Sequence, residues 1–521
     1  MSPLQFSVFW RLSVIFFFNP FLFFLDIFTN ELAAGTCPHG NGTTAVPVSG
    51  GGASPADNQS EGREVSVSAA DWWRDRLAPN SVCSWRDWLS YGQTVYMMGL
   101  LLGSLVGGAI SDRFGKRPVL LVSVFVFAVC GVIPAILPQP HVFLAVRCVT
   151  AVSCCWINIC AFSLAVEWTP PPARIWPPAF LPFCFSLGTM GGALLAWLSP
   201  SWTQLHLSLA LPQLMFLPLY LPIPESPRWL LLHRRMEVLE RYRGNSPADQ
   251  RCLDQLLDSA WSDLQKTARA VPASAGPAHL GCSALKHPTI LLRLLVMSYL
   301  SAATALTYFG ICINIGSFGV GVHTAQFFSG LSEAPCLLVP LVRLGRRPVS
   351  MLALSLSGAA CFASLLLSRC GAAPVLVMGL ALLGKLCILA VMFVSVLYSI
   401  ELFPTVIRQR CVSLVNLSFR LGSLAATLAP PGPDGAISLA AMVVYSSGPV
   451  LGSALCLLLP ETSGVPLPDS LEDCDGQPWP PRLWRPWKLL SRETETPETP
   501  ETVPAEKNDS SSLFLSSTCS S

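Results

Sequence analysis

Charge is scarce in this sequence. Only 12% of its 521 residues are Asp, Glu, Lys or Arg, and 52% are hydrophobic, whereas about a quarter of the residues of an average soluble protein are charged. This composition excludes a soluble globular protein and predicts one that crosses a lipid bilayer many times. The formal net charge of +2 gives no indication of a nucleic-acid partner.

Motifs of ATP hydrolysis, metal binding and catalysis are also missing. No Gly-x-x-x-x-Gly-Lys-Ser/Thr phosphate-binding loop occurs, which excludes an ATP-driven pump. The 19 cysteines form no Cys-x-x-Cys pattern, and neighbours such as Cys154 and Cys155 lie inside apolar runs, where cysteine behaves as a small hydrophobic residue. We therefore expect no enzymatic activity, no metal site and no cofactor.

Long apolar runs are abundant instead. Twelve of them are long enough to cross a hydrocarbon layer about 30 Å thick. The first run, near 8–28, could be a membrane helix or a cleaved signal peptide. Its length and the lack of a clear small-residue cleavage site favour a membrane helix. The other runs lie near 91–110, 118–137, 141–165, 175–197, 203–223, 290–315, 322–341, 349–368, 374–400, 408–429 and 436–459.

These runs predict six segments. They are a first membrane helix (1–28), an extracellular loop (29–90), membrane helices 2–6 (91–223), a cytoplasmic central loop (224–289), membrane helices 7–12 (290–460) and a disordered cytoplasmic tail (461–521). In the central loop, apolar residues between Asp249 and Lys266 follow a helical stripe, which predicts an amphipathic helix. The tail has Glu-Thr-Pro repeats and a serine-rich run, a composition typical of disorder.

The basic residues predict the orientation in the membrane. Short loops on one side hold nine Lys or Arg residues, and those on the other side hold only Arg369. The positive-inside rule therefore places both termini in the cytoplasm. The long first loop is then extracellular, where Asn41 and Asn58 lie in glycosylation sequons and Cys37 and Cys83, its only cysteines, can form a disulfide.

Three short motifs occur twice in the same order. The first pair is GAISDRFGKR at 108–117 and LVRLGRR at 341–347, with 343 − 113 = 230 residues between the aligned arginines. The second is EWTPPPAR at 167–174 and ELFPTVIR at 401–408, at an offset of 401 − 167 = 234. The third is PES at 224–226 and PET at 460–462, at an offset of 460 − 224 = 236. One order at nearly one spacing indicates the internal duplication of a bundle of membrane helices.

These motifs resemble those of one family. The plan of six plus six helices with the GAISDRFGKR turn resembles the major facilitator superfamily. More specifically, the chain is similar to the organic cation and anion transporters, solute carrier family 22, in the motifs at 96–103, 167–170, 225–229, 401–408 and 459–462. The resemblance covers about 83–475 and implies an all-α membrane protein of twelve transmembrane helices with pseudo-two-fold symmetry. Substrate would then bind at mid-depth, between two halves that rock around it.

Three charged residues lie near the middle of apolar runs in the second half, namely Glu333, Lys385 and Arg420. A charge at a helix centre costs about 2.5–3.5 kcal/mol on insertion scales, so none should face lipid. One interpretation is a structural ion pair of Glu333 with Lys385 or Arg420. The other is a binding site, because one carboxylate and two cations leave one positive charge that an anionic substrate can neutralise. Arg420 fits this role best, since its guanidinium grips a carboxylate through two hydrogen bonds.

The resemblance agrees on the sign of this site. Anion-carrying members have an arginine at the position of Arg420, whereas cation-carrying members have an aspartate. The anion carriers also have a lysine at the position of Leu337, so one expected contact is missing here. Aromatic walls suit flat organic substrates, although ordinary helix packing is the competing interpretation. The matching aromatic residues are Tyr308, Phe309, Phe183 and Phe185.

Charged residues at the inner ends of the helices predict a gate. Ion pairs there must break when the inner face opens, so their strength biases the outward-facing state. Asp112 is expected to pair with Arg113 or with a neighbouring loop; simple positive-inside anchoring explains the basic residues but not the acidic ones. The expected gating residues are Asp112, Arg113, Arg117, Glu167, Arg174, Arg343, Arg347, Glu401 and Arg408.

We therefore expect a secondary active transporter that moves small organic anions across the plasma membrane by alternating access, with a counter-anion as a candidate for exchange. The alternative is a family member with impaired transport that acts as a membrane receptor or scaffold. Leu337, the unusual N-terminus and six prolines around the start of the fifth helix favour the alternative, whereas Arg420, Lys385 and Tyr308 favour transport. The sequence does not indicate the oligomeric state.

Overall fold

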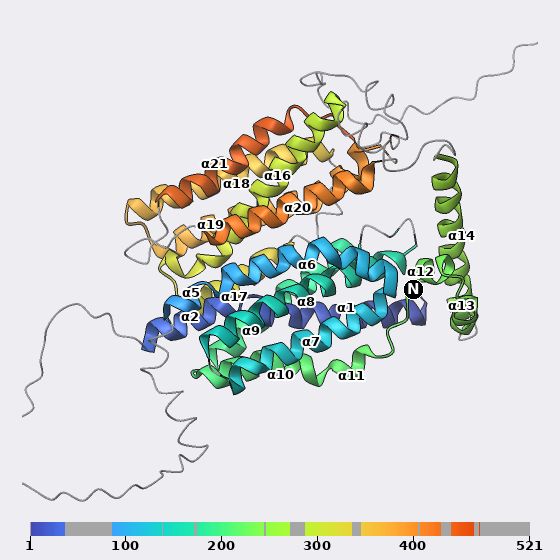
Figure 1. Ribbon diagram of the computed structural model, residues 1–521. Helices are drawn as coiled ribbons and strands as arrows, with labels where there is room; N and C mark the ends of the chain where they lie inside the picture. Colours follow the sequence, from blue (N-terminus) through green and yellow to red (C-terminus); the bar gives the residue numbers. More distant parts are fainter. Residues whose placement is uncertain are drawn as a thin grey trace, which may run out of the picture. The chain divides into compact units, whose positions relative to one another are not determined.

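The computed structural model describes residues 2–36, 86–137, 139–170, 173, 176–243, 246–270, 287–335, 345–404, 407–428, 439–462 and 468 (Figure 1). Within these ranges the chain forms helices and no strand. All of them belong to one compact unit, Met1–Pro481.

The first half begins with two helices that continue each other. They are α1 (Pro3–Phe23) and α2 (Leu25–Thr36), and together they contain an almost wholly buried apolar span, Pro3–Ala33. The remaining helices of this half are α5 (Arg86–Ser90), α6 (Gly92–Phe114), α7 (Lys116–Ile136), α8 (Pro140–Glu167), α9 (Pro177–Trp197), α10 (Trp202–Met215) and α11 (Leu217–Tyr220).

The second half repeats this plan after a central segment. Its helices are α16 (Pro288–Ile313), α17 (Val322–Glu333), α18 (Arg346–Arg369), α19 (Pro374–Leu402), α20 (Arg408–Thr427) and α21 (Leu439–Cys456), with a short 3-10 turn, η2 (Ile315–Phe318), after α16. Each of the twelve apolar runs in the sequence corresponds to a helix or a helix pair of the structure.

Eight of the described helices are long and apolar enough by themselves to cross a membrane. The other four expected passages are α10, α17, α20 and α21, and each falls short for a visible reason. The helix α20 carries Arg408, Arg410 and Arg420, and α10 ends beyond Pro212, where α11 takes over. The described part of α17 ends near Glu333, and α21 is only 18 residues long.

The prolines at the start of the fifth membrane helix leave it intact. The helix α9 begins with Pro177 and Pro178 in its first turn, where the missing N–H groups need no partner. Only Pro182 lies inside the helix, and its carbonyl lies 3.0 Å from Ser186 Oγ. The proline-rich sequence is therefore compatible with a working membrane helix.

Two glycines allow close helix contacts at equivalent positions of the two halves. Gly188 of α9 lies against the backbone carbonyl of Phe17 in α1, and Gly422 of α20 lies against the backbone of Ala302 in α16. The two glycines are 234 residues apart (422 − 188 = 234), which is the offset of the second repeated motif. The packing of α1 on α9 thus recurs as the packing of α16 on α20, as a pseudo-two-fold relation between the halves requires.

The most extensive contacts between the halves, among the described residues, are made by two helix pairs. The helix α6 packs against α20, and α9 packs against α17; Figure 1 shows α6 and α20 adjacent along their length. A smaller contact joins α2 to α17, where Phe28 stacks on His323 with ring centroids 5.4 Å apart.

The central segment forms three helices, α12 (Pro227–Leu232), α13 (Met236–Arg243) and α14 (Pro247–Ala270). The helix α14 contains the amphipathic helix expected from the sequence. It is joined to the start of the chain, because the backbone N–H of Leu4 donates to Asp249 Oδ1 at 3.1 Å. The start of α1 and the central segment therefore lie at the same end of the first half.

Several expected features fall outside the described residues. These are the sequons at Asn41 and Asn58, the cysteines Cys37 and Cys83, the position Leu337 and the C-terminal tail.

Candidate functional site

A buried ion pair lies where α17 and α19 meet. Lys385 Nζ is 2.6 Å from Glu333 Oε1, and the two side chains are 0% and 4% exposed. The hydroxyl of Tyr308 donates to Glu333 Oε1 at 2.7 Å, and Ser186 Oγ of α9 donates to Oε2 at 2.8 Å. Lys385 also donates to the hydroxyl of Ser329. The carboxylate is thus fully engaged, and one of its donors comes from the other half of the molecule.

The sequence allowed a structural ion pair of Glu333 with either Lys385 or Arg420. The structure contains this ion pair, and the partner is Lys385. A buried carboxylate and a buried ammonium group neutralise each other, and hydrogen bonds satisfy the remaining polar atoms. Lys385 therefore contributes no free positive charge to a site between the halves. Tyr308 binds Glu333 through its hydroxyl, and its ring lies 5.2 Å from the ammonium group of Lys385.

Arg420 of α20 has a different environment. It is half-buried, and among the described residues no carboxylate pairs with it. Its guanidinium lies 5.8 Å from the ring centroid of its neighbour Phe419, a favourable contact between a cation and an aromatic face. Of the two cations Lys385 and Arg420, Arg420 is therefore the one that Glu333 does not neutralise.

Aromatic rings from both halves gather beside Arg420. We call Phe23, Phe185, Phe309 and Phe419 the central aromatic cluster. The ring of Phe23 stacks on Phe309 with centroids 6.1 Å apart and meets Phe185 edge-on at 5.8 Å, while Phe309 meets Phe419 edge-on at 6.2 Å. Two of the expected aromatic residues, Phe185 and Phe309, are thus in the cluster. Phe183 is not, because its ring contact is with Phe180.

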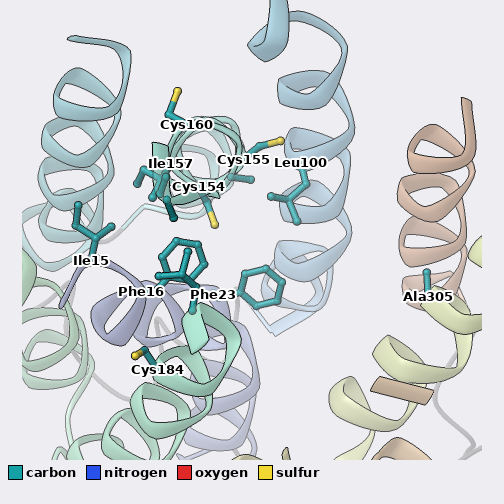
Figure 2. Close-up of a cluster of buried hydrophobic side chains, with 14 of the residues drawn as sticks. Ile15, Phe16, Phe23, Leu100, Cys154, Cys155, Ile157, Cys160, Cys184 and Ala305 are labelled. Carbon is teal, nitrogen blue, oxygen red and sulfur yellow. The ribbon is translucent and has the colours of Figure 1, made fainter. Parts of the chain in front are cut away.

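Figure 2 shows how the first half presents Phe23 to this region. The rings of Phe16 and Phe23 on α1 point into the space between α6 and α8, toward the sulfur of Cys154 and the side chain of Leu100. Cys154 Sγ also donates to Asn19 Oδ1 at 3.2 Å. The adjacent cysteines of α8 are therefore packing residues, as the sequence predicts.

A second buried ion pair was not anticipated. Arg147 Nη2 of α8 is 2.5 Å from Asp26 Oδ2 of α2, and both residues are at most 2% exposed. Arg147 also donates to the carbonyl of Leu22 at 2.7 Å, and its guanidinium lies 4.2 Å from the ring centroid of Tyr96. Asp26 Oδ1 has no hydrogen-bond partner among the residues that the structure describes. The signal was present in the sequence, since opposite charges stand at the outer ends of the first and fourth apolar runs.

The repeated motifs form a network at the end of the first half that holds the start of α1, and we call this end the inner face. Glu225 accepts hydrogen bonds from the backbone N–H groups of Lys116 (3.0 Å), Arg117 (3.2 Å) and Ser226 (2.9 Å). It thereby caps the N-terminus of α7, where unpaired N–H groups and the helix dipole favour an anion. Lys116 forms an ion pair with Glu167, which also accepts from the hydroxyl of Ser226.

The second half repeats this network residue by residue. Glu461 accepts from the backbone N–H groups of Arg346 (2.8 Å), Arg347 (3.1 Å) and Thr462 (3.1 Å), and thereby caps α18. Arg346 pairs with Glu401 at 3.2 Å, and Thr462 donates to Glu401 at 2.7 Å.

The arginines and glycines of the two turns match as well. Arg117 donates to the carbonyl of Leu221 at 2.9 Å, and Arg347 donates to that of Leu457 at 3.0 Å. A Cβ at Gly115, whose φ is +95°, would lie 2.6 Å from Glu225, and a Cβ at Gly345 would lie 2.5 Å from Glu461. Glycine is therefore needed in both turns so that the carboxylate can reach the helix start.

Several expected gate contacts differ from this arrangement. The expected ion pair of Asp112 is absent among the described residues, and the side chain of Asp112 is exposed. The backbone carbonyl of Asp112 accepts a hydrogen bond from Trp229 Nε1 at 2.9 Å. Arg113 is exposed and lies over the ring of Phe114. Arg408 donates to the carbonyl of Phe403 at 3.0 Å. Arg174 and Arg343 lie outside the described residues.

Removal of the Glu225 cap should destabilise the first half. The variant Glu225→Ala leaves three backbone N–H groups without their acceptor, and each unsatisfied buried group costs about 1–3 kcal/mol, so the detergent-solubilised protein should melt at a lower temperature. Glu237→Ala on α13 is the matched control, because Glu237 is exposed. Equal melting temperatures for the two variants would contradict the capping role.

The comparisons with known proteins agree with this architecture. Residues 80–469 match the family described as "Sugar (and other) transporter". The chain is 30% identical over 406 residues to "Solute carrier family 22 member 6" of Rattus norvegicus, covering 76% of this chain and 72% of that protein. It is 29% identical over 432 residues to "Solute carrier family 22 member 13" of Homo sapiens (82% and 73%) and 29% identical over 432 residues to "Organic anion transporter 3" of Oryctolagus cuniculus (81% and 77%).

A solved structure supports the fold. The xylose transporter XylE of E. coli, in a partially occluded inward-open conformation, is similar with a TM-score of 0.60 over 89% of this chain and 100% of that chain, at 16% identity. The expected twelve-helix major facilitator fold is thereby confirmed. These relatives are membrane transporters and not enzymes. With most of its length matched, the chain belongs to solute carrier family 22 of the major facilitator superfamily, and is closer to the organic anion transporter branch than to the cation branch.

Proposed function

We propose that the protein is a secondary active transporter that carries small organic anions by alternating access. The observation that carries this proposal is Arg420, a half-buried cation beside the central aromatic cluster that has no carboxylate partner among the described residues. A relative named "Organic anion transporter 3" is 29% identical to this chain.

The physical argument is one of charge compensation. A charged group removed from water is costly unless a partner of opposite sign neutralises it. An organic anion supplies that partner, and a carboxylate fits the planar guanidinium of Arg420 through two parallel hydrogen bonds. The rings of Phe309 and Phe419 offer apolar faces beside the charge, so an anion with a flat organic body meets both requirements.

The inner-face networks suit a rigid-body mechanism. Glu167 and Glu225 join α7, α8 and the segment after α11 within the first half, and Glu401 and Glu461 do the same for the second half. Each half can therefore move as a unit. The contacts that must break when the halves separate include the hydrogen bond from Ser186 to Glu333, so we assign the networks to rigidity within a half and the Ser186–Glu333 bond to the gate.

We place the transporter in the plasma membrane with both termini in the cytoplasm. The contact between Leu4 and Asp249 holds the start of the chain and the central segment at one face, and the surplus of Lys and Arg in the short loops of that face indicates the cytoplasm. The long first loop is then outside, with Asn41 and Asn58 as glycosylation sites and Cys37 and Cys83 as a disulfide. A counter-anion is the natural exchange partner for an electroneutral cycle.

The alternative of a receptor or scaffold without transport is not favoured. The family match spans both halves, the two inner-face networks are complete, and Arg420 stands beside an aromatic cluster built from both halves. A receptor or scaffold would still need the two networks in order to fold, but it would not need a cation without a carboxylate partner beside aromatic rings from both halves.

The proposed function is tested by reversing the charge at position 420. In cells that express the protein, we expect saturable uptake of a labelled panel of organic anions. The variant Arg420→Asp should abolish this uptake or redirect it to organic cations, because the site then carries the opposite charge. The loss should be at least about tenfold, which corresponds to 1.36 kcal/mol of lost interaction.

Two controls accompany this experiment. Arg369→Asp makes the same change at an exposed position at the end of α18 and should leave uptake unchanged. Arg420→Lys keeps the charge but loses the planar fork, so it should retain part of the activity. If the surface level is normal and no anion enters, the receptor or scaffold alternative replaces this proposal.

A further inference from the structure

One face of α17 packs against the first half of the molecule. His323 stacks on Phe28 of α2, with ring centroids 5.4 Å apart and an angle of 17° between the planes. Gly330 lies against the backbone carbonyl of Ser186 in α9, and Ser186 Oγ lies 2.8 Å from Glu333 Oε2. His323, Gly330 and Glu333 stand at positions i, i+7 and i+10, which lie on one face of a helix. This face is therefore the contact of α17 with the first half.

The first turn of α17 closes the outer side of this contact. The helix α1 begins at the inner face, where Leu4 contacts Asp249. Because α2 is the far end of the same apolar span, Pro3–Ala33, it lies on the outer side. His323 meets α2 and so lies there too. In an alternating-access cycle this contact must separate when the site opens outward. We call the stacked rings of Phe28 and His323 the outer gate.

The same face of α17 buries a polar group that closure leaves unsatisfied. Gln326 lies one turn from His323 and is 1% exposed. Within the described part of the chain, neither Oε1 nor Nε2 of Gln326 has a hydrogen-bond partner. A buried polar group without a partner is costly, and water satisfies it once the halves separate. Gln326 therefore weakens the closed gate, so that a small change at His323 is enough to shift the balance between closed and open.

From this geometry we infer that His323 is a sensor of external pH and that its protonation opens the outer gate. Histidine is the side chain whose ordinary titration range lies between about pH 5 and 8. His323 is half-buried at the outer side, where external protons reach it. This role of His323 goes beyond the proposed anion transport, and it rests on the orientation and the alternating access proposed above.

Two effects disfavour a charged imidazole in the closed gate. Closure holds the ring of His323 against Phe28 and removes water that would solvate the charge. His323 is also the second residue of α17, where unpaired N–H groups and the helix dipole disfavour a cation. The face of the Phe28 ring attracts a cation, but this effect is small where water is near. Protonation therefore favours the open gate, in which water surrounds the ring.

Few charged groups are placed to oppose this shift. The main contacts of α17 are with α2, α9, α19 and η2, and α9 and η2 contain no charged residue. The helices α17 and α19 contribute Glu333, Lys385 and Glu401, and α2 contributes Asp26 and Glu31. All of these except Glu31 are held in the ion pairs described above. Glu31 attracts a charged imidazole, but it is exposed, so this attraction is screened and smaller than the loss of water.

The test measures how far the outer gate is open at two external pH values. Gln326→Cys supplies a reporter thiol behind the gate, which a membrane-impermeant thiol reagent reaches from outside while the gate is open. Cys370, exposed directly after α18, is the internal reference, because acid lowers the thiolate fraction of both thiols alike. Peptide mass spectrometry gives the two labelling rates, and their ratio is the measured quantity.

Acidification should raise the ratio of the reporter rate to the Cys370 rate. Between about pH 7.4 and about pH 5.5, across the titration range of histidine, we expect a rise of about two- to fivefold. This is the size of the interaction between a charge and the dipole at a helix end. Gln326→Cys also removes the unpaired amide, which stabilises the closed gate and lowers the labelling at the higher pH.

Three variants, each with the reporter, identify the group responsible. His323→Phe keeps a ring against Phe28 but cannot be protonated, so the ratio should not change with pH. His323→Gln replaces it if that variant does not reach the surface. Glu31→Gln removes the opposing attraction, so the rise should be at least as large as with Glu31 present. His141→Phe is the matched control, because His141 is an exposed histidine at the start of α8, and the response should remain.

The outcomes are distinguishable from failure of the proposed function. A ratio that stays constant or falls on acidification would overturn the sensor, and so would a response that persists in His323→Phe. A reporter that is labelled at neither pH would overturn the outer gate itself. Labelling does not require a transported anion. Uptake of an aryl sulfonate, which keeps its charge over this pH range, is the separate measurement that reports on anion transport.

Discussion

Replacement of Gly188 with alanine is expected to abolish the folded transporter. A Cβ at this position of α9 would overlap the backbone carbonyl of Phe17 in α1 and would lie 2.7 Å from Pro20. A flexible side chain can move aside, but a helix backbone cannot do so without moving its whole element. Because membrane helices associate largely through close backbone packing, we expect a loss at or above the upper end of the about 1–3 kcal/mol that overpacking costs.

The measurement is the surface level and the melting temperature of the detergent-solubilised protein. Gly108→Ala is the matched control, since a Cβ at Gly108 of α6 would meet nothing within 4 Å. Gly422→Ala should reproduce the defect in the second half, where the added atom would overlap the backbone of Ala302. A Gly188→Ala protein that folds and melts like the control would show that α1 and α9 pack less closely than the structure indicates.

The membrane helices were the most predictable part of this fold. The expected passage at 118–137 is found at Lys116–Ile136, and the one at 141–165 at Pro140–Glu167. Apolar run length sets such helices, and glycine and proline mark their ends. The close approach at Gly188 was not predictable in the same way, because the sequence does not reveal which backbone lies opposite a given glycine. The shared offset with Gly422 became informative only with the helix pairs in view.

The site was predictable in its composition but not in its pairing. Glu333, Lys385 and Arg420 stood out because charges are rare inside apolar runs, yet the choice of Lys385 as the partner depends on the positions of α17 and α19. On the inner face, Glu167 and Glu401 were expected to act, but their partners Lys116 and Arg346 were not singled out. Lys116 and Arg346 each follow the glycine of a repeated turn. A comparison of the two turns could therefore have identified them as equivalent partners of Glu167 and Glu401.

The duplication also separates two roles among the buried charges. The carboxylate caps Glu225 and Glu461 occupy equivalent places and hold equivalent helix starts, as expected of structural parts. The charged side chains inside the helices are not equivalent. The first half pairs Asp26 with Arg147 near the outer ends of their runs, whereas the second half pairs Glu333 with Lys385 and has Arg420 at mid-helix beside an aromatic ring. Asymmetry between repeats that are otherwise alike is what a binding site for a single small anion would require.

Disruption of the Asp26–Arg147 pair should be the other severe change. Arg147→Met leaves Asp26 as a buried carboxylate whose Oδ1 already has no donor within the described part of the chain. Breaking a buried pair from one side costs about 3–5 kcal/mol. Asp26→Asn should be milder, because the carbonyl of Leu22 and the ring of Tyr96 still hold the guanidinium of Arg147. Both variants should melt at a lower temperature than the natural protein, with Arg147→Met the lower of the two.

Simultaneous removal of both charges identifies the origin of that loss. The double variant Asp26→Leu/Arg147→Met leaves no unpaired charge, and well-packed apolar replacements of a buried pair are often neutral, so it should melt closer to the natural protein than Arg147→Met does. With the single variant Asp26→Leu measured beside Arg147→Met, the coupling between the two positions follows from the stabilities of the two single variants and the double variant. If the double variant lost as much stability as the single variants Asp26→Leu and Arg147→Met together, the two side chains would not be interacting.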